Sequence, residues 1–215
     1  MARQRCEPRA WPSSTSDYGA SVTEETRVRH RGAYVEMLVG SVIGLIASFI
    51  LATDAIVLAA NPDAIFSCDI NSKISCGTVG SSWQANLLGF PNAFLGLVTE
   101  PVVITVAVAA LGGVRFPRWF MLTAQGFYAI GFGFAYWLFF QSYFVIGALC
   151  PWCLTITVTT TLVFFSITRV NILDGNLRFG RATSAVQTAT RGWADVYLML
   201  AILAVFAAMV GVRYL

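Results

Sequence analysis

Five long apolar segments dominate the chain, and shorter polar connections separate them. Each segment approaches the roughly 20 residues that an α-helix needs to cross the hydrocarbon core of a bilayer. The segments lie near Ala33–Leu58, Gly89–Gly112, Trp119–Phe140, Leu149–Val170 and Val196–Val212. This pattern predicts an all-α membrane protein with five transmembrane helices.

The polar connections divide the expected fold into parts. Residues 1–32 are polar and rich in Arg and Ser, and we expect them to form a cytoplasmic tail. The apolar run behind them is too long for the apolar part of a signal peptide, so the first helix is predicted to stay in the protein. A core of residues 33–170 follows, with an external loop over residues 59–88. A cytoplasmic connection, residues 171–195, then leads to a fifth helix, residues 196–215.

Composition supports a membrane protein and excludes a soluble domain. Hydrophobic residues make up 57% of the chain and charged residues 12%, whereas a soluble domain has about 25% charged residues. The net charge is only +3, and the basic residues form no single patch beside aromatic residues. Nucleic-acid binding is therefore not expected.

The basic residues predict the orientation, because cytoplasmic connections of membrane proteins are enriched in Lys and Arg. Of the 14 basic residues, only Lys73 and Arg213 fall on one side of the predicted helices. The others are Arg3, Arg5, Arg9, Arg27, Arg29, Arg31, Arg115, Arg118, Arg169, Arg178, Arg181 and Arg191. We therefore expect a multi-pass protein of the cell (inner) membrane, with a cytoplasmic N-terminus and an external C-terminus.

This topology sorts the five cysteines between two compartments. Cys6 lies in the cytoplasmic tail, where thiols are kept reduced. Cys68 and Cys76 lie in the external loop, and Cys150 and Cys153 lie at the external end of the fourth helix. Four cysteines are thus predicted to meet on the oxidising side of the membrane.

The sequence Cys150-Pro-Trp-Cys153 opens the fourth apolar segment. Proline is favoured at the first position of a helix, so Cys150 is predicted to be the N-cap and Cys153 the third helical residue. The spacing of three places both sulfurs on one face. Free N–H groups and the helix dipole stabilise a thiolate at this position and lower the thiol pKa. The predicted depth also allows a lipid-soluble molecule to reach the sulfur from the bilayer.

Several kinds of chemistry fit four cysteines on one side. Zinc binding is one alternative, since Cys-x-x-Cys is a common ligand pair, but the seven residues between Cys68 and Cys76 exceed the usual ligand spacing. Purely structural disulfides are another, but a Cys-x-x-Cys bridge closes too small a loop to stabilise much by chain entropy. Redox chemistry is therefore favoured, without a metal. No histidine follows the motif, so covalent haem attachment is not supported.

A combination of motifs resembles the bacterial members of the vitamin K epoxide reductase family. Cys68 and Cys76 form a loop pair, and Ser82 follows six residues after the second. Gly-Phe-Pro-Asn-Ala-Phe-Leu-Gly, residues 89–96, opens the second helix, and Cys150-Pro-Trp-Cys153 opens the fourth. Each motif is weak alone, but together and in this order they are specific. The resemblance covers about residues 33–170.

The resemblance implies a fold and an activity. The fold is a four-helix transmembrane bundle around a quinone site, with a fifth, peripheral transmembrane helix. The activity is oxidation of a thioredoxin-like (DsbA-type) dithiol protein coupled to reduction of a membrane quinone, menaquinone or ubiquinone. This activity would support disulfide bond formation outside the cytoplasm.

The resemblance also implies roles for individual residues. A reduced partner attacks Cys68 of a Cys68–Cys76 disulfide, and the released Cys76 attacks Cys150 of a Cys150–Cys153 disulfide. Cys153 then delivers the electrons to the quinone. Ser82 matches a serine near the active site, with a helix cap as its alternative role.

Asn92 is the last position that the resemblance assigns. It matches an asparagine that hydrogen-bonds the quinone carbonyl, and its alternative role is that of a polar residue at a helix end.

In two respects the chain departs from the family pattern. Thr157 stands where animal members carry a tyrosine, which leaves the contacts to the quinone headgroup open. Many bacterial members carry a fused thioredoxin-like domain, but this sequence holds no further Cys-x-x-Cys, so the partner is expected to be a separate protein.

Two rival interpretations stay open at this point. A DsbB-type quinone reductase performs the same overall reaction, but there the Cys-x-x-Cys precedes the wider pair. A structural or transport protein with bracing disulfides is the rival from a different class. Two acidic residues add little to the choice: Glu100 is expected to be hydrogen-bonded inside the bundle, and Asp54 to reach the membrane interface.

Overall fold

The computed structural model describes residues 15–177 and 180–214. Cys6, three of the tail arginines, Arg178 and Leu215 lie outside these ranges. The described residues are almost entirely helical and contain two isolated β-bridges. The α-helices are α1 (Thr15–Ala60), α2 (Cys76–Gly80), α3 (Ala93–Leu111), α4 (Arg118–Phe140), α5 (Pro151–Leu173), α6 (Thr183–Arg191) and α7 (Ala194–Tyr214).

Five of these helices are long and apolar enough to cross a membrane, as the sequence predicts. The first differs most from its expected bounds, because α1 begins at Thr15 rather than near Ala33. No proline stands between Pro12 and Pro62 to interrupt it. The third span also continues beyond its expected end, as a π-helical turn, η2 (Gln141–Ile146), which ends at a left-handed Gly147 with φ 79°.

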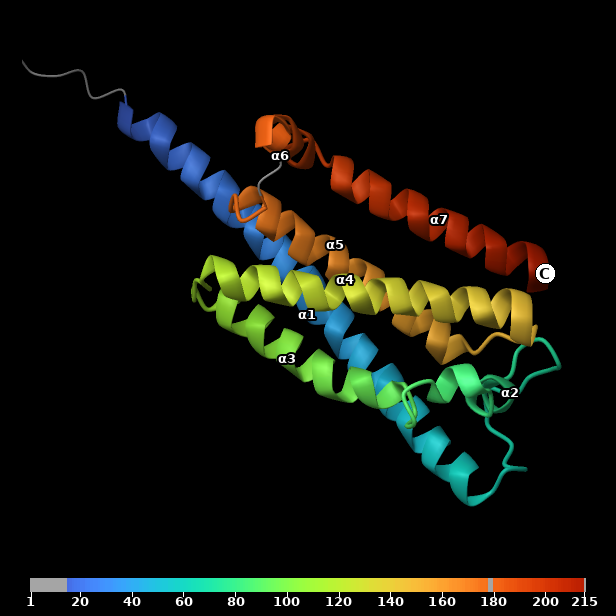
Figure 1. The fold of residues 1–215 in the computed structure, drawn as a ribbon. Coiled ribbons are helices and arrows are strands. Elements are labelled where there is room, and N and C mark those ends of the chain that lie inside the picture. The colour runs from blue at the N-terminus through green and yellow to red at the C-terminus, as the bar shows by residue number, and fades with distance from the viewer. Residues whose placement is uncertain (1–14, 178–179, 215) are drawn as a thin grey trace, which may run out of the picture.

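Four helices form a bundle, and α7 lies on its outside (Figure 1). Helix α1 packs against α3 and α5, and α4 packs against α5. Glycines allow α1 to approach its neighbours closely. A Cβ atom added to Gly40 would lie 3.1 Å from Cγ2 of Val163, and one added to Gly44 would lie 3.1 Å from Oγ1 of Thr159. The Gly-x-x-x-Gly spacing thus serves packing within the bundle.

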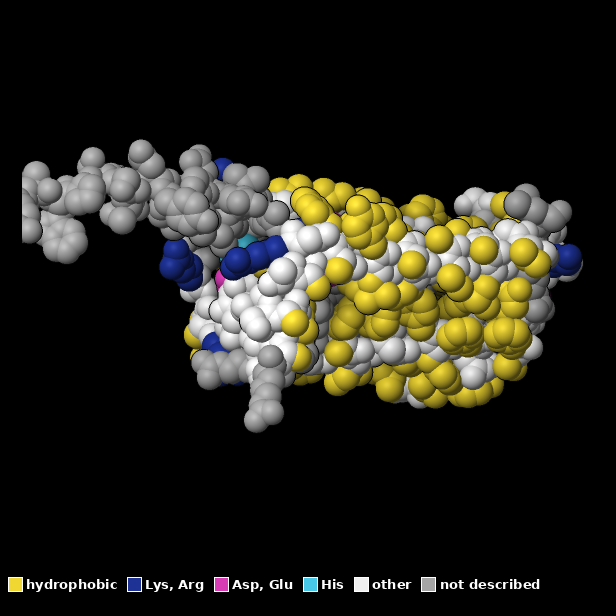
Figure 2. Space-filling model, turned by 90° about the horizontal axis from the view of Figure 1, so that it is seen from above, with side chains coloured by type: hydrophobic (Ala, Val, Ile, Leu, Met, Phe, Trp, Pro, Cys, Tyr) yellow, Lys and Arg dark blue, Asp and Glu magenta, His cyan; other side chains and the backbone are white. Residues whose placement is uncertain are grey.

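The outer surface is what a lipid-facing protein requires. Large apolar side chains cover much of the face seen in Figure 2. Phe127 and Ile130 of α4, for example, are each 72% exposed. Exposure of this kind is unfavourable in water but not beside lipid tails, so the protein is a multi-pass membrane protein.

The connections sort to the two ends of the bundle in the predicted way. The turn between α3 and α4 and the helix α6 lie at one end, and α2 and the C-terminal end of α7 lie at the other (Figure 1). The basic connections therefore share one end and the cysteine-bearing segments share the opposite end. Which end faces the cytoplasm stays a prediction.

Arg169, counted from the sequence with the basic residues on the cytoplasmic side, is a residue of a transmembrane helix. Helix α5 continues to Leu173, so Arg169 is one of its residues and is only 5% exposed. Its guanidinium Nη1 donates to Oδ2 of Asp195 in α7 at 3.2 Å. The guanidinium carbon Cζ lies 4.4 Å from the ring centroid of Trp193. This ion pair attaches the peripheral helix to the bundle.

Candidate active site

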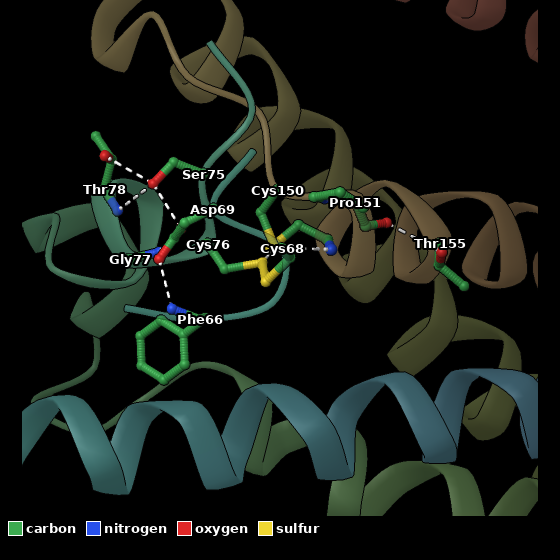
Figure 3. The surroundings of a disulfide bond; sticks show 11 residues. Phe66, Cys68, Asp69, Ser75, Cys76, Gly77, Thr78, Cys150, Pro151 and Thr155 are labelled. Atoms are coloured by element: carbon green, nitrogen blue, oxygen red, sulfur yellow. Dashed lines mark hydrogen bonds between the residues drawn. A yellow bond between two sulfur atoms is a disulfide. The ribbon is translucent and has the colours of Figure 1, made fainter. Parts of the chain in front are cut away.

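One carboxylate organises the loop that carries the first cysteine pair. Oδ2 of Asp69 accepts a hydrogen bond from the Phe66 N–H at 2.8 Å. Oδ1 accepts from the Ser75 hydroxyl at 2.8 Å and from the Gly77 N–H at 3.0 Å (Figure 3). These bonds bring together the two ends of the segment that contains Cys68.

The environment of Asp69 favours its ionised form. Burial alone would raise the pKa of Asp69, but the hydrogen bonds from Phe66, Gly77 and Ser75 outweigh it and lower the pKa. Gly77 leaves room for this arrangement, since a Cβ atom there would lie 3.2 Å from the carboxylate. The loop is therefore closed around a charged group.

This loop contains a disulfide between Cys68 and Cys76, whose Cα atoms lie 5.7 Å apart. Cys76 is the first residue of α2, and Ser75 caps that helix by accepting from the Thr78 N–H at 3.0 Å. The same serine thus binds the Asp69 carboxylate and fixes the start of the helix. Both cysteines are buried.

A short backbone pairing sets the loop against the start of α5. The Leu149 N–H donates to the Lys73 carbonyl at 2.8 Å, and the Ser75 N–H donates to the Leu149 carbonyl at 3.0 Å. The residues that follow Ser75 and Leu149 are Cys76 and Cys150. The pairing therefore brings one cysteine of each pair to the same place.

Cys150 is the N-cap of α5, as predicted, and Pro151 is the first helical residue. Sγ of Cys150 lies 3.3 Å from Sγ of Cys76 and accepts a hydrogen bond from the Cys153 N–H at 3.4 Å. The hydrogen bond from the Cys153 thiol, with backbone N–H groups of Cys153 and Trp152, lowers the pKa of Cys150 against the effect of burial. Cys150 and Cys153 are thiols in this structure.

The sulfurs lie in an apolar cluster. Cys68, Cys76 and Cys150 are buried together with Val79 and Ala148. The partly buried side chains around them are Leu51, Phe66, Ile146, Trp152 and Cys153. Cys153 is less buried than Cys150 and lies one turn further along the helix. The arrangement allows thiol–disulfide exchange at Cys76 and Cys150, shielded from water.

The model of the vitamin K epoxide reductase family matches residues 35–168. The chain belongs to this family. It is accordingly a membrane thiol oxidoreductase, and the match covers the four bundle helices together with both cysteine pairs. A comparison with curated protein sequences found no match.

Ser82, one of the two polar positions expected in this family member, lies beside the cysteine cluster. It stands at the start of the 3-10 turn η1 (Trp83–Asn86), but its side chain does not cap that turn. Instead its hydroxyl donates to the carbonyl of Val79 at 2.6 Å, and Val79 packs against the cysteines. Its predicted role in the site stays a prediction.

Asn92 precedes α3 and also makes no capping bond. Its Nδ2 donates to the Gln84 carbonyl at 2.7 Å, which ties the end of the loop together. Its Oδ1 is buried and has no hydrogen-bond partner among the described residues. A buried polar atom without a partner is unfavourable, and a ligand hydroxyl can satisfy it. The hydroxyl of a reduced quinone could donate to this oxygen, whereas a quinone carbonyl could not, so the predicted bond from Asn92 to a quinone carbonyl would have to come from Nδ2 and stays a prediction.

Asp54 is a member of the site that the sequence pattern missed. Its expected position at the membrane interface stays a prediction. A carboxylate oxygen of Asp54 and the sulfurs of Cys68 and Cys76 all lie within 4.8 Å of one another. Three such groups can in general bind a metal ion. Here the two sulfurs are bonded to each other and have no thiolate charge for a metal.

Glu100 is buried inside the bundle, as the sequence predicts. It is 6% exposed, and Oε2 accepts a hydrogen bond from the Tyr128 hydroxyl at 3.1 Å. The added Cβ at Gly44 would lie 3.3 Å from its Oε1. Glu100 therefore joins α1, α3 and α4.

Proposed function

We propose that this member of the vitamin K epoxide reductase family oxidises a separate thioredoxin-like (DsbA-type) dithiol protein and reduces a membrane quinone. The observation that carries the proposal is the 3.3 Å separation of Cys76 Sγ and Cys150 Sγ. At this distance a disulfide in the loop and a thiol on the helix can exchange with little movement. The quinone is menaquinone or ubiquinone, and the product supports disulfide formation outside the cytoplasm.

The first half of the reaction takes place at the loop. A thiolate of the partner attacks Sγ of Cys68, the Cys68–Cys76 bond breaks, and Cys76 leaves with the electron pair. Cys76 then attacks Sγ of Cys150 in a Cys150–Cys153 disulfide, and Cys153 leaves as a thiolate. The second partner thiol releases Cys68, and Cys68 re-forms its bond with Cys76, which leaves Cys150 reduced. The partner has lost two electrons, and the helix pair has gained them.

The second half takes place at the helix pair. Cys153 is proposed to face the quinone, since it lies one turn further along α5 than Cys150. A bound quinone accepts two electrons and two protons, and the Cys150–Cys153 disulfide re-forms. Asn92 is proposed to donate from Nδ2 to a carbonyl of the quinone, and its Oδ1, which has no partner in the described chain, is proposed to accept from a hydroxyl of the quinol that forms. Ser82 is proposed to help position α2 beside the cysteines, through its hydrogen bond to the Val79 carbonyl.

Anaerobic mixing tests this function. The purified protein is combined with a reduced thioredoxin-like protein and with menaquinone or ubiquinone analogues, and quinone absorbance is followed. We expect quinone reduction that matches partner thiols lost, and no reduction by Cys150→Ala or Cys153→Ala. If these variants reduce the quinone as fast as the wild type, the cysteines only brace the fold.

A further inference from the structure

Exchange between cysteines buried in an apolar cluster requires a proton acceptor close to the sulfurs. A thiol must lose its proton before it attacks, and a thiolate that leaves must regain one. At an exposed site, water can accept and donate these protons. Here Cys68, Cys76 and Cys150 are each less than 9% exposed. The sole histidine of the chain, His30, lies at the other end of the bundle beside Asp174.

Asp54 is held in position for this task by the register of α1. Leu51 of the same helix packs against the cysteine cluster. Leu58 lies against α2, because a Cβ atom on Gly80 would be 3.4 Å from its Cδ2. Residues three and four apart share one face of a helix, so Asp54 faces the cysteine loop between these two contacts. Its carboxylate is half-buried and makes no hydrogen bond within the described residues.

Among the described ionisable groups near the cysteines, Asp54 is the one available to accept a proton. Asp69, the carboxylate of the cysteine loop, is not available as proton acceptor, because both of its oxygens accept hydrogen bonds that close the loop. The sulfurs of Cys68 and Cys76 lie within 4.8 Å of a carboxylate oxygen of Asp54. A negative charge on Asp54 also acts to raise the pKa of Cys150 at the start of α5. A negative Asp54 disfavours a thiolate beside it, so one proton shared between carboxylate and sulfur is the favoured state.

We propose that Asp54 is the proton-transfer residue of the cysteine relay. Asp54, as a carboxylic acid, protonates Cys76 when the partner thiolate breaks the Cys68–Cys76 bond, and it takes this proton back as Cys76 attacks Sγ of Cys150. The Cys76–Cys150 bond then forms, the Cys150–Cys153 bond breaks, and Cys153 leaves as a thiolate. When Cys68 re-forms its bond with Cys76, Cys150 leaves as a thiolate and Asp54 returns the proton to it. Charge and protons balance, because the charges of the two partner thiolates end on the Cys153 thiolate and the Asp54 carboxylate, and the proton of Asp54 ends on Cys150. This role rests on the proposed relay between the loop and the helix.

The test measures the exchange step alone, without quinone, in the full-length protein with Cys6→Ser. Protein with both disulfides formed is mixed with increasing dithiothreitol, quenched with acid and alkylated, and labelling of Cys153 is counted by mass spectrometry. The rate that no longer depends on dithiothreitol reports the internal step. A Cys68→Ser, Cys76→Ser variant gives the rate of direct reduction of the helix pair. If that variant matches the wild type, the relay is absent and the proposed function fails by itself.

The pH dependence of the internal rate then decides the role of Asp54. In wild type the rate should change little between about pH 6 and about pH 8, below the ordinary thiol pKa of about 8.5. In Asp54→Asn it should fall about 100-fold at the acid end, the low end of what positioned acid–base groups contribute. It should then rise about tenfold per pH unit as solvent supplies the thiolate.

Two further variants complete the design. Asp54→Glu keeps a carboxyl group and should keep the flat profile, which also covers the case in which Asp54→Asn does not fold. Asp63→Asn removes an exposed carboxylate from the same loop and should behave as wild type. A rate in Asp54→Asn that equals the wild type, or that is lowered equally at every pH, would overturn the proposal.

Discussion

Sγ of Cys150 lies 3.3 Å from Sγ of Cys76, although 74 residues separate the two in sequence. The two cysteines directly follow Ser75 and Leu149, whose backbones are hydrogen-bonded to each other. Cys76 begins α2, and Cys150 caps the start of α5. The loop disulfide and the helix thiols therefore meet before any partner binds. Exchange between them needs rotation of side chains rather than refolding of the loop.

Replacement of Cys153 by Ala should trap this contact as a covalent bond. Cys150 then lacks its usual partner, and its thiolate attacks Cys76 and releases Cys68. Lys73 is the sole lysine and lies between Cys68 and Cys76. A lysine-specific protease acting on denatured, thiol-blocked protein should thus cut the chain once. Wild-type fragments should stay joined through Cys68–Cys76, whereas most Cys153→Ala fragments should separate without reductant.

The control for this experiment is Cys150→Ala, and all the proteins compared carry Cys6→Ser to remove a possible false link. It leaves Cys153 unpaired but removes the attacking sulfur, so its fragments should remain joined. Thiols must be blocked before denaturation to prevent scrambling. Joined fragments in Cys153→Ala, together with labelling of Cys150 as a free thiol, would contradict the step from loop to helix.

Asp69→Asn should loosen the loop without removing a cysteine. The carboxylate accepts three hydrogen bonds, and bonds to a charged group contribute about 1.5–3 kcal/mol each. Cleavage of the native protein at Lys73 should therefore become roughly tenfold faster or more, because it tracks local opening. Asp63→Asn is the matched control and should not change the rate.

The same carboxylate gives a pH dependence whose sign is fixed. The pKa of Asp69 is lowered in the folded protein, so its contribution to stability is fully present above its unfolded pKa of about 3.9. The contribution is lost as pH falls through the lower folded value. The thermal midpoints of wild type and Asp69→Asn should therefore differ at neutral pH and converge in strong acid. A difference that is equally large in acid would mean that the charge is not what holds the loop.

The parts of the fold that the sequence predicts are those set by local patterns. Apolar segments of spanning length give the five helices, and Pro151 gives the start of α5 with Cys150 as its cap. The pairing of Leu149 with Ser75 is not predictable in this way, because it joins backbone groups far apart in sequence. The hydrogen bonds of Asp69 are not predictable either, because they form only once the loop has folded.

The proximity of Asp54 to the cysteines is not predictable for a different reason. The segment of α1 around it is apolar on nearly every side, since lipid covers one face and other helices cover the rest. An apolar–polar alternation therefore does not reveal which face looks inward. Only the packing of Leu51 and Leu58 shows that Asp54 faces the cysteine loop.

Asp195→Asn should weaken the attachment of α7 to the bundle. Arg169 is buried, and loss of one partner of a buried ion pair costs about 3–5 kcal/mol. Glu36 lines the same small cavity as Arg169 and Asp195 and can partly replace the lost charge, so the loss here should be smaller, about 1–3 kcal/mol. Thermal unfolding in detergent measures it, and a double-mutant cycle with Arg169→Met isolates the pair. Additive effects of the two changes would show that the ion pair does not couple the helices.

The orientation of the whole relay depends on a prediction that reporter fusions can check. The basic connections lie at one end of the bundle, and α2 and the end of α7 lie at the other. Because Arg and Lys are retained on the cytoplasmic side, the cysteine end should face outward. A reporter enzyme that is active only outside the cytoplasm should thus be active when fused after Leu215 and at least about tenfold weaker when fused after Gly180. Activity from the Gly180 fusion alone would place the four cysteines in the reducing compartment, where a disulfide relay to an external partner cannot operate.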